Sequence, residues 1–237
     1  MSDSRNNTIT LVALIAGGVL STAAFFMAWF YAPFSLLADG KTIDFAQKIF
    51  YFHVPVAESS FLVFGFAAYY GIRFLMTKKR EYDLKARVAM EVTTMFVVLT
   101  MATGILWTRA EWNVWWVWEP RLTTYFILTL LVIGYFVLRN SVEDEERRAT
   151  YAAVFCIIAF LDAPISFFIT RFMASSASNH PVVFGGGPGT GLAPAMLITF
   201  ILAQVAMLLF AYAIFQVRMR EERLGEQLEA IKIALGG

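Results

Sequence analysis

Two histidines are the first residues whose chemistry stands out, because the 237 residues contain no others. His53 lies in QKIFYFHVPVA and His180 lies in SSASNHPVV, and each has a proline within two residues on its C-terminal side. Proline fixes the local backbone and disfavours helix just before it. Each imidazole is therefore expected at a rigid element boundary, which suits a ligand and also suits a plain turn.

The pair of histidines is more informative than either member. A single imidazole at a membrane interface is an ordinary hydrogen-bonding group, whereas two neutral imidazoles on opposite sides of a cleft form an axial pair for haem iron. Zinc normally takes a third or fourth ligand, and the chain has no HxxxH or CxxC spacing to supply one. The single cysteine, Cys156, falls inside an apolar segment, so thiol–disulfide chemistry is not expected.

Tryptophan is concentrated in one segment, EWNVWWVWEPRL at residues 111–122, which holds four of the six tryptophans, with Trp107 just upstream. An aromatic belt at a membrane interface would be spread over the ends of several helices. The spacing i, i+3, i+4 and i+7 of one helical face is found at Trp112, Trp115, Trp116 and Glu119. We therefore expect a short interfacial helix that lies flat on the bilayer and presents an indole platform, with Trp118 directed elsewhere, into the bundle or the lipid headgroups.

The end of the same segment predicts a binding site for an acid group. Pro120 reads as the first turn of a helix, and Arg121 follows it. A helix N-terminus beside an arginine is a favourable place for a carboxylate, and indole faces suit a flat apolar macrocycle. Composition and spacing thus point to haem or a quinone-like ligand, with haem propionates at this arginine.

The elements that position these residues are predicted to be membrane helices. Hydrophobic residues make up 59% of the chain, against about 45–50% in soluble domains. A spanning helix needs roughly 20 mostly apolar residues, and six segments qualify, at approximately 9–33, 54–76, 88–106, 121–139, 149–170 and 193–217. We expect an all-α fold, a single six-helix membrane domain over residues 1–237. The first segment is long enough to span, so it is expected to stay in the mature protein.

Basic residues set the expected orientation, because lysine and arginine accumulate in short cytoplasmic loops. Three stretches are rich in them: Lys78, Lys79, Arg80, Lys85 and Arg87; then Arg139, Arg147 and Arg148; then Arg218, Arg220 and Arg223. The other loops hold only Lys41 and Lys48, Arg109 and Arg121, and Arg171. Both termini are therefore predicted to be cytoplasmic, and the histidines and tryptophans to face outward. Residues 218–237 are expected to form a cytoplasmic helical tail, the alternative being a solvated tail.

These residues resemble a known family. WNVWWVWEPRLT is similar to the tryptophan-rich signature WGxxWxWDxRLT of the haem-handling membrane proteins of cytochrome c maturation, the CcmC/CcmF/CcsA family. YFHVPVAESSFLVF resembles the family's HVP segment, and LDAPISFF followed by NHP resembles its fifth-helix segment and second histidine. The resemblance covers essentially the whole chain, and size and helix count match the CcmC branch.

The resemblance implies a set of site residues. His53 and His180 would be the axial ligands of the iron of haem b. The haem platform would comprise Trp112, Trp115, Trp116, Trp118, Glu119 and Arg121. The chain departs from the signature in three places: Asn113 replaces a glycine, Glu119 replaces an aspartate and is followed by Pro120, and fewer aromatics precede the second histidine.

The resemblance also implies a role and partners. Proteins of the CcmC branch are non-enzymatic subunits of the bacterial inner membrane that hold haem at the periplasmic face. They present it to the haem chaperone CcmE, which takes the haem covalently on its own histidine. An ABC transporter made of CcmA and CcmB hydrolyses ATP to drive release, and the small subunit CcmD completes the complex. No nucleic-acid partner is implied, and the lipid bilayer is the surrounding medium.

Three other functions were weighed against this role. A membrane electron-transfer protein would need haems at both faces, and no histidine falls on the predicted cytoplasmic side. A haem channel acting alone would need a polar path through helices that read as apolar. A c-type haem lyase subunit remains an alternative.

Three further features each allow two interpretations. GGGPGTG at Gly185–Gly191 lacks the GK[ST] ending of a phosphate loop and is expected to be a connector or an acceptor-docking loop. Glu58 and Asp162 fall in membrane segments, where either a structural hydrogen bond or a role near the haem is expected.

Overall fold

The computed structural model describes residues 2–36, 43–172 and 191–235. In these residues the fold is helical apart from a two-residue antiparallel pairing of β1 (Ser35–Leu36) with β2 (Ile43–Asp44). The helices are α1 (Ser2–Phe30), the 3₁₀ turn η1 (Ala46–Ile49), α2 (Phe50–Thr77), α3 (Arg80–Trp112), α4 (Pro120–Ser141), α5 (Glu145–Phe160), α6 (Asp162–Phe172) and α7 (Pro194–Ala234). Six helical stretches in the described chain are long and apolar enough to cross a membrane, which confirms the six predicted segments.

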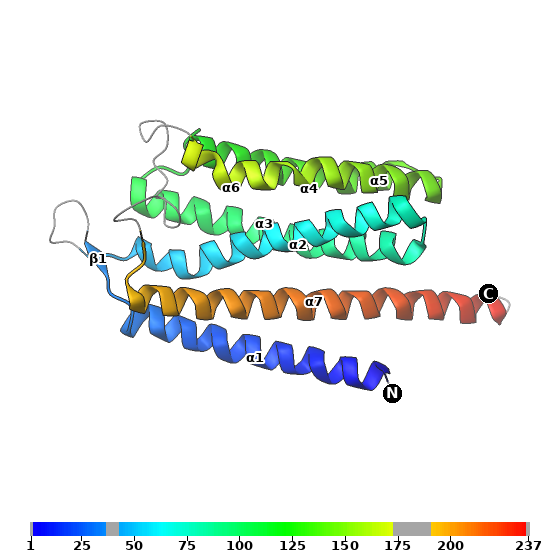
Figure 1. The fold of residues 1–237 in the computed structure, drawn as a ribbon, viewed down its shortest axis with the longest axis horizontal. Helices are drawn as coiled ribbons and strands as arrows, with labels where there is room; N and C mark the ends of the chain where they lie inside the picture. Colours follow the sequence, from blue (N-terminus) through cyan, green and yellow to red (C-terminus); the bar gives the residue numbers. More distant parts are fainter. Residues whose placement is uncertain (1, 37–42, 173–190, 236–237) are drawn as a thin grey trace.

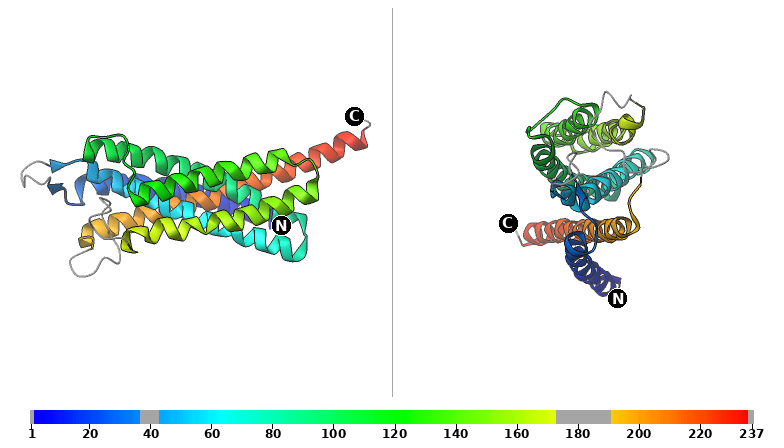
Figure 2. Two further views of the ribbon diagram at one scale, coloured as in Figure 1. Left: turned by 90° about the horizontal axis from the view of Figure 1, so that it is seen from above. Right: turned by 90° about the vertical axis from the view of Figure 1, so that its left-hand side faces the viewer.

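The helices form three layers that run roughly side by side (Figure 1). α2 and α3 make the middle layer, α4, α5 and α6 cover one side of it, and α7 covers the other with α1 packed on the outer side of α7, as the end-on view in Figure 2 shows. α2 is central because it packs against α3, α5 and α7. The core between the first two layers contains Phe64, Phe96, Leu128 and Tyr135, all nearly inaccessible to solvent. Gly71 allows close approach, because a Cβ there would lie 3.3 Å from the carbonyl oxygen of Ala153 on α5.

Both described ends of the chain lie at the same end of the bundle (Figure 1). The opposite end carries β1, β2, η1 and the segment Asn113–Glu119 between α3 and α4, and we call it the loop end. An even number of spans requires this arrangement. It is compatible with the predicted orientation, in which the loop end would be the outer one.

The fifth predicted span is divided into two helices. α5 ends at Phe160, Leu161 forms a turn, and α6 begins at Asp162. Pro164 explains the break, because a proline removes one backbone N–H and its ring clashes with the carbonyl four residues earlier, here that of Phe160.

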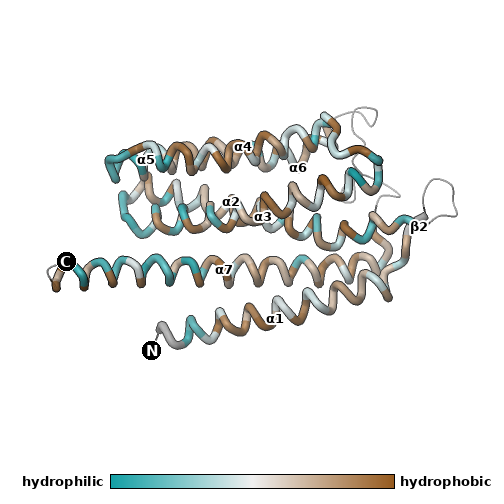
Figure 3. Tube along the Cα trace, turned by 180° about the vertical axis from the view of Figure 1, so that it is seen from behind, coloured by the Kyte–Doolittle hydropathy of each residue, from teal (hydrophilic) through white to brown (hydrophobic). Residues whose placement is uncertain are grey.

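The predicted helical tail is continuous with the last span. α7 contains 41 residues without a break, which corresponds to roughly 60 Å at 1.5 Å per residue, or about twice the hydrocarbon thickness of a bilayer. Its last third is mostly solvent-exposed and hydrophilic, and it extends past the other helices (Figure 3). Residues 218–234 are therefore helical, and most of their side chains are exposed, so the helix and the solvated tail describe the same segment.

Charged residues at the end with the termini are paired across helices. Arg139 on α4 donates two hydrogen bonds of 2.7 Å to the carboxylate of Asp83 on α3, and both side chains are largely buried. Arg218 on α7 binds Glu91 on α3 at 2.7 Å. These pairs hold the layers together where the hydrophobic middle of the bundle ends, and planar two-point pairing favours arginine over lysine there.

We expect Asp83→Asn to destabilise the protein by about 3 kcal/mol, because Arg139 would keep its charge in a buried position without a partner. Thermal unfolding in detergent should show a lower Tm. Glu229→Gln is the matched control, because its ion pair with Lys232 is two-thirds exposed on both sides and such pairs contribute little. Equal melting of the two variants would show that the Asp83–Arg139 pair does not join α3 to α4.

Candidate functional site

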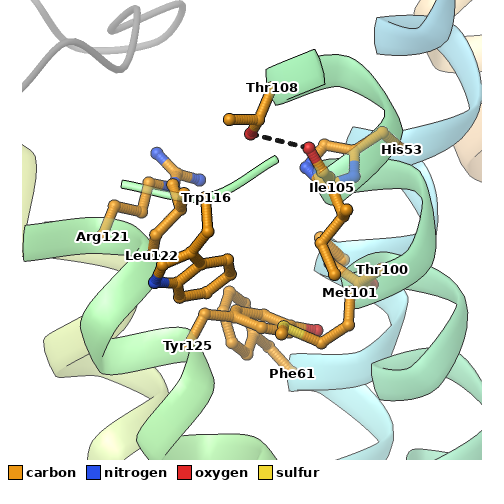
Figure 4. Close-up of a pocket in the computed structure, with 12 residues that line it drawn as sticks. His53, Phe61, Thr100, Met101, Ile105, Thr108, Trp116, Arg121, Leu122 and Tyr125 are labelled. Carbon is orange, nitrogen blue, oxygen red and sulfur yellow. Dashed lines mark hydrogen bonds between the residues drawn. The ribbon is translucent and has the colours of Figure 1, made fainter. Parts of the chain in front are cut away.

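A small hollow at the loop end brings three predicted site residues together (Figure 4). It is bounded by α2, α3, α4 and the segment Asn113–Glu119, which we call the tryptophan loop. The lining residues are His53, Ala57, Phe61, Thr100, Met101, Gly104, Ile105, Thr108, Trp116, Arg121, Leu122 and Tyr125. His53, Trp116 and Arg121 come from three separate parts of the chain and face the same space.

His53 is held in the first turns of α2 by two residues of α3. Its Nδ1 lies 2.9 Å from the hydroxyl oxygen of Thr103. Gly104 lets the ring lie against α3, because a Cβ at that position would be only 3.1 Å from the imidazole Cε1. The ring is thus positioned by one hydrogen bond and one close packing contact.

The hydrogen bonds of Thr103 determine the tautomer of His53. The hydroxyl group of Thr103 has one hydrogen, which it donates to the carbonyl oxygen of Leu99 at 2.8 Å and shares with that of Thr100 at 3.2 Å. When that hydrogen is donated to Leu99, the oxygen accepts from the imidazole, and in this arrangement Nδ1 of His53 carries the proton and Nε2 carries the lone pair. Metal-binding histidines have this arrangement, with the second nitrogen donating to a supporting oxygen.

The tryptophan loop does not form the predicted interfacial helix. α3 continues to Trp112, Asn113 adopts a left-handed conformation with φ 57°, and residues 113–119 have no helical structure. Two local causes oppose a helix here: the left-handed residue ends α3, and Pro120 disfavours helical geometry at Glu119. Arg109 reinforces the turn by donating to the carbonyl oxygen of Asn113. The prediction of a flat helical platform was wrong.

The tryptophans form two groups instead of one platform. Trp112 packs edge-on against Trp107 with ring centres 5.0 Å apart. Trp116 and Trp118 pack edge-on against each other and against Phe126. Trp115 and Trp118 are 60% and 71% exposed, so they offer apolar surface outside the hollow, whereas Trp116 is partly buried and lines it.

The indole N–H of Trp116 lacks an acceptor. Nε1 is buried and has no hydrogen-bond partner among the described residues. A buried donor without a partner costs about 1–3 kcal/mol. Because this side chain lines the hollow, an acceptor supplied by a bound molecule would remove that cost.

Glu119 caps α4. It is 6% exposed, and its Oε1 accepts the backbone N–H of Leu122 at 3.0 Å. Pro120 occupies the first helical position, as predicted. Arg121 follows within the first turn and lines the hollow beside Trp116 (Figure 4). The cap therefore keeps the carboxylate away from the hollow and leaves the arginine at its edge.

The side chains around the hollow suit haem, but the hollow is too small to enclose it. An imidazole with Nε2 as acceptor, an arginine and an unpartnered indole N–H are the groups that iron and a carboxylate would need. The enclosed volume, however, is about 50 Å³, against about 300–1,000 Å³ for pockets that enclose a drug-sized ligand. A porphyrin would have to lie at the mouth of this hollow.

The remaining predicted site residues are not in the hollow. His180 and most of the Gly185–Gly191 stretch lie outside the described residues. Glu58 lines a different cavity, between α2 and α6. Asp162 stands at the break before α6, and one oxygen of its carboxylate is buried without a partner among the described residues.

Three residues of the site were not predicted from the sequence. Thr103 and Gly104 position His53, and Tyr125 closes one side of the hollow with its hydroxyl 3.1 Å from that of Ser60. A threonine followed by glycine near the end of a membrane helix was the available signal, because glycine there admits a close neighbour.

Comparison with known proteins gives concordant matches. A family model described as heme exporter protein C matches residues 3–234. The heme exporter protein C of Paracoccus denitrificans is 25% identical over 227 residues, which is 96% of this chain and 92% of that protein. That of Bradyrhizobium diazoefficiens is 28% identical over 186 residues, 78% of this chain and 70% of that protein. A ccmC-like mitochondrial protein of Marchantia polymorpha, named for cytochrome c biosynthesis, is 32% identical over 126 residues, 52% of this chain and 53% of that protein.

We expect Asn113→Gly to leave the tryptophan loop intact, because glycine adopts a left-handed conformation without strain. Asn113→Val should destabilise the protein by about 1–2 kcal/mol, since a side chain with a branched Cβ is strained at φ 57°. Tryptophan fluorescence and thermal unfolding would compare the two. A valine variant that melts and emits like the parent would mean that the loop does not depend on this turn.

Proposed function

The chain belongs to the heme exporter protein C family, and from this premise we propose that it binds haem b at the loop end and presents it to the next carrier in cytochrome c maturation. The observation that carries the proposal is the hydrogen bond between His53 and Thr103, because it positions the ring through Nδ1 and leaves Nε2 as the nitrogen for a metal. The role is haem delivery and not catalysis.

The proposal assigns a part to each group at the hollow. Nε2 of His53, together with His180 as assigned from the sequence, would hold the haem iron. Arg121 binds a haem propionate with the help of the positive end of α4. The indole N–H of Trp116 donates to a polar group of the cargo. Bound haem supplies an iron that takes two nitrogen ligands, and the protein positions these ligands.

The exposed tryptophans are proposed to cover the macrocycle where it extends beyond the hollow. Trp115 and Trp118 are the most exposed side chains of the loop's indoles, and the large apolar face of an indole is costly to leave in water. Haem at the mouth of the hollow would bury part of them. The same loop would then lie next to the acceptor protein during transfer.

We also propose the partners and the membrane orientation, on the basis of the family. The loop end faces the periplasm in the bacterial inner membrane, and the acceptor is the haem chaperone CcmE. CcmA and CcmB form the ABC transporter in which ATP hydrolysis occurs, and CcmD is the small additional subunit. The unequal distribution of basic residues between the two ends supports this orientation.

The test uses the purified chain with added haem in detergent. His53→Ala should abolish the absorption bands of six-coordinate haem. Thr103→Val should retain a histidine-ligated spectrum but weaken haem binding about tenfold to a hundredfold, because loss of the supporting hydrogen bond frees the ring. Thr103→Ser should restore binding.

The matched control for this test is Thr94→Val. Thr94 also donates to a carbonyl of its own helix, that of Met90 at 2.7 Å, but it does not line the hollow. It should bind haem like the parent. An unchanged spectrum and affinity in His53→Ala would remove His53 from the haem site and with it the main support for the proposal.

Arg121→Gln should weaken haem retention, because it removes the charge that faces the propionate while keeping a hydrogen-bond donor. Arg121→Lys should be partly tolerated, since an ammonium group cannot make the planar two-point contact of a guanidinium. Dissociation of haem to an excess of apomyoglobin measures retention. Arg148→Gln, an arginine at the opposite end, is the control, and equal dissociation from Arg121→Gln and the parent would place the propionates elsewhere.

A further inference from the structure

A second, larger cavity lies on a different face of α2. α1 packs along α7 and makes few contacts with α2, which leaves a groove between α1 and α2 with α7 as its floor. Its volume is about 600 Å³, within the range of about 300–1,000 Å³ typical of ligand pockets. The lining residues are Ser21, Ala24, Phe25, Ala28, Trp29, Phe45, Lys48, Ile49, Tyr51, Phe52, Ala203, Met207 and Phe210. We call it the α1–α2 groove.

The walls of the groove are rich in flat side chains. Six of the thirteen lining residues are aromatic: Phe25, Trp29, Phe45, Tyr51, Phe52 and Phe210. Phe25, Phe45 and Phe52 remain 60%, 58% and 40% exposed. Aromatic faces and edges match a planar aromatic ligand better than they match flexible acyl chains, because they add ring-stacking to simple burial.

A buried cation lies at the loop end of the groove. Lys48 is 7% exposed, donates to the carbonyl oxygens of Ala32 and Pro33 at 3.0 and 3.2 Å, and lies 3.8 Å above the ring centre of Phe34. Asp44 attracts it at longer range, and no described carboxylate forms an ion pair with it. A lysine has three donors and one full charge, so an acid group in the groove would find a complementary partner here.

A buried hydroxyl group completes the polar part of the groove. Tyr51 is 5% exposed, and its hydroxyl has no hydrogen-bond partner among the described residues. The hydroxyl of Ser21, on the α1 side, is also buried and without a described partner. Buried polar groups are nearly always hydrogen-bonded in folded proteins. Two of the nine such atoms in the described residues belong to side chains that line this groove, where a polar group of a bound molecule would give them partners.

We propose that the α1–α2 groove is a second cargo site that binds a tetrapyrrole, with the macrocycle on the aromatic walls and a carboxylate at Lys48 and Tyr51. The proposal rests on the proposed function for the class of ligand, and it needs no iron ligand. Phe52 lines the groove and the next residue, His53, lines the hollow, so the two sites are separated by the width of one helix. The groove is positioned to hold cargo before it reaches His53.

The experiment titrates metal-free protoporphyrin IX into the purified full-length chain in nanodiscs of phosphatidylcholine, with porphyrin fluorescence as the readout. A porphyrin without iron cannot be ligated by His53, so binding that depends on Lys48 and not on Arg121 reports on the groove. Lys48→Met should weaken binding roughly tenfold or more, since a hydrogen bond to a charged group is lost. Tyr51→Phe should weaken it by a smaller factor, and Lys48→Arg should retain it.

Matched controls come from the other end of the bundle. Lys85 also lies over aromatic rings, those of Tyr70 and Tyr82 at 5.8 and 5.6 Å, and Lys85→Met should bind porphyrin like the parent. Tyr69 is half exposed to its surroundings, and Tyr69→Phe should be neutral. Ser21→Leu places a larger side chain in the groove from α1 and leaves Lys48 unchanged. If Lys48→Met does not fold, loss of porphyrin binding in Ser21→Leu tests the proposal instead.

Three outcomes would overturn the proposal. One is porphyrin binding that persists in both Lys48→Met and Ser21→Leu. The second is porphyrin binding that disappears in Arg121→Gln, which would place the porphyrin at the hollow alone. The third combines two results: phosphatidylglycerol displaces the porphyrin, and native mass spectra show lipid bound to the parent but not to Lys48→Met. Together these results would assign the groove to an anionic lipid. Failure of haem ligation at His53 would instead contradict the proposed function and leave these measurements unaffected.

Discussion

Backbone groups inside a lipid bilayer have no water to bond, so each N–H and C=O must be paired within the chain, and helices are the structures that achieve this in a single segment. The described fold obeys this constraint, since its irregular backbone lies between helices at the two ends of the bundle. The one break inside a described span is a single residue, Leu161, between α5 and α6. Trp116, on irregular backbone, can therefore meet side chains from the first turns of helices only at an end, which is where it comes together with His53 of α2 and Arg121 of α4.

The same constraint acts on side chains in the interior. Thr93, Thr100 and Thr108 on α3 each donate to the carbonyl four residues earlier, so their hydroxyl groups are satisfied by their own helix. Thr103 does this as well and still has an oxygen left for His53. A helix that satisfies its own hydroxyl groups can thus position a neighbour's imidazole without leaving a polar group unpaired. The polar atoms that do lack described partners at Trp116 and Tyr51 belong to residues lining the hollow and the α1–α2 groove.

Much of the fold was predictable because its determinants are local and long. Six apolar segments, the break before Pro164 and the start of α4 at Pro120 all depend on composition or on proline stereochemistry. The tryptophan loop was predicted wrongly because a spacing of i, i+3, i+4 and i+7 over eight residues says little about the backbone. One left-handed residue, Asn113, and the residue before a proline decided the conformation instead. The family's glycine at the position of Asn113 was the sign that a turn was required there.

The parts of the site that escaped prediction depend on which helix faces which. The glycine that follows Thr103 is the only feature that separates it from the other threonines of α3, and its meaning becomes clear only when α2 is placed against it. Lys48 shows the same limit for charge. Counted as one of two lysines in a poorly basic loop, it served only to orient the chain, yet the structure buries it between two carbonyl groups and an aromatic ring. Burying a lysine costs free energy unless its charge is paired. An acid group in the apolar groove beside Lys48 would pair with it, which the count of basic residues does not reveal.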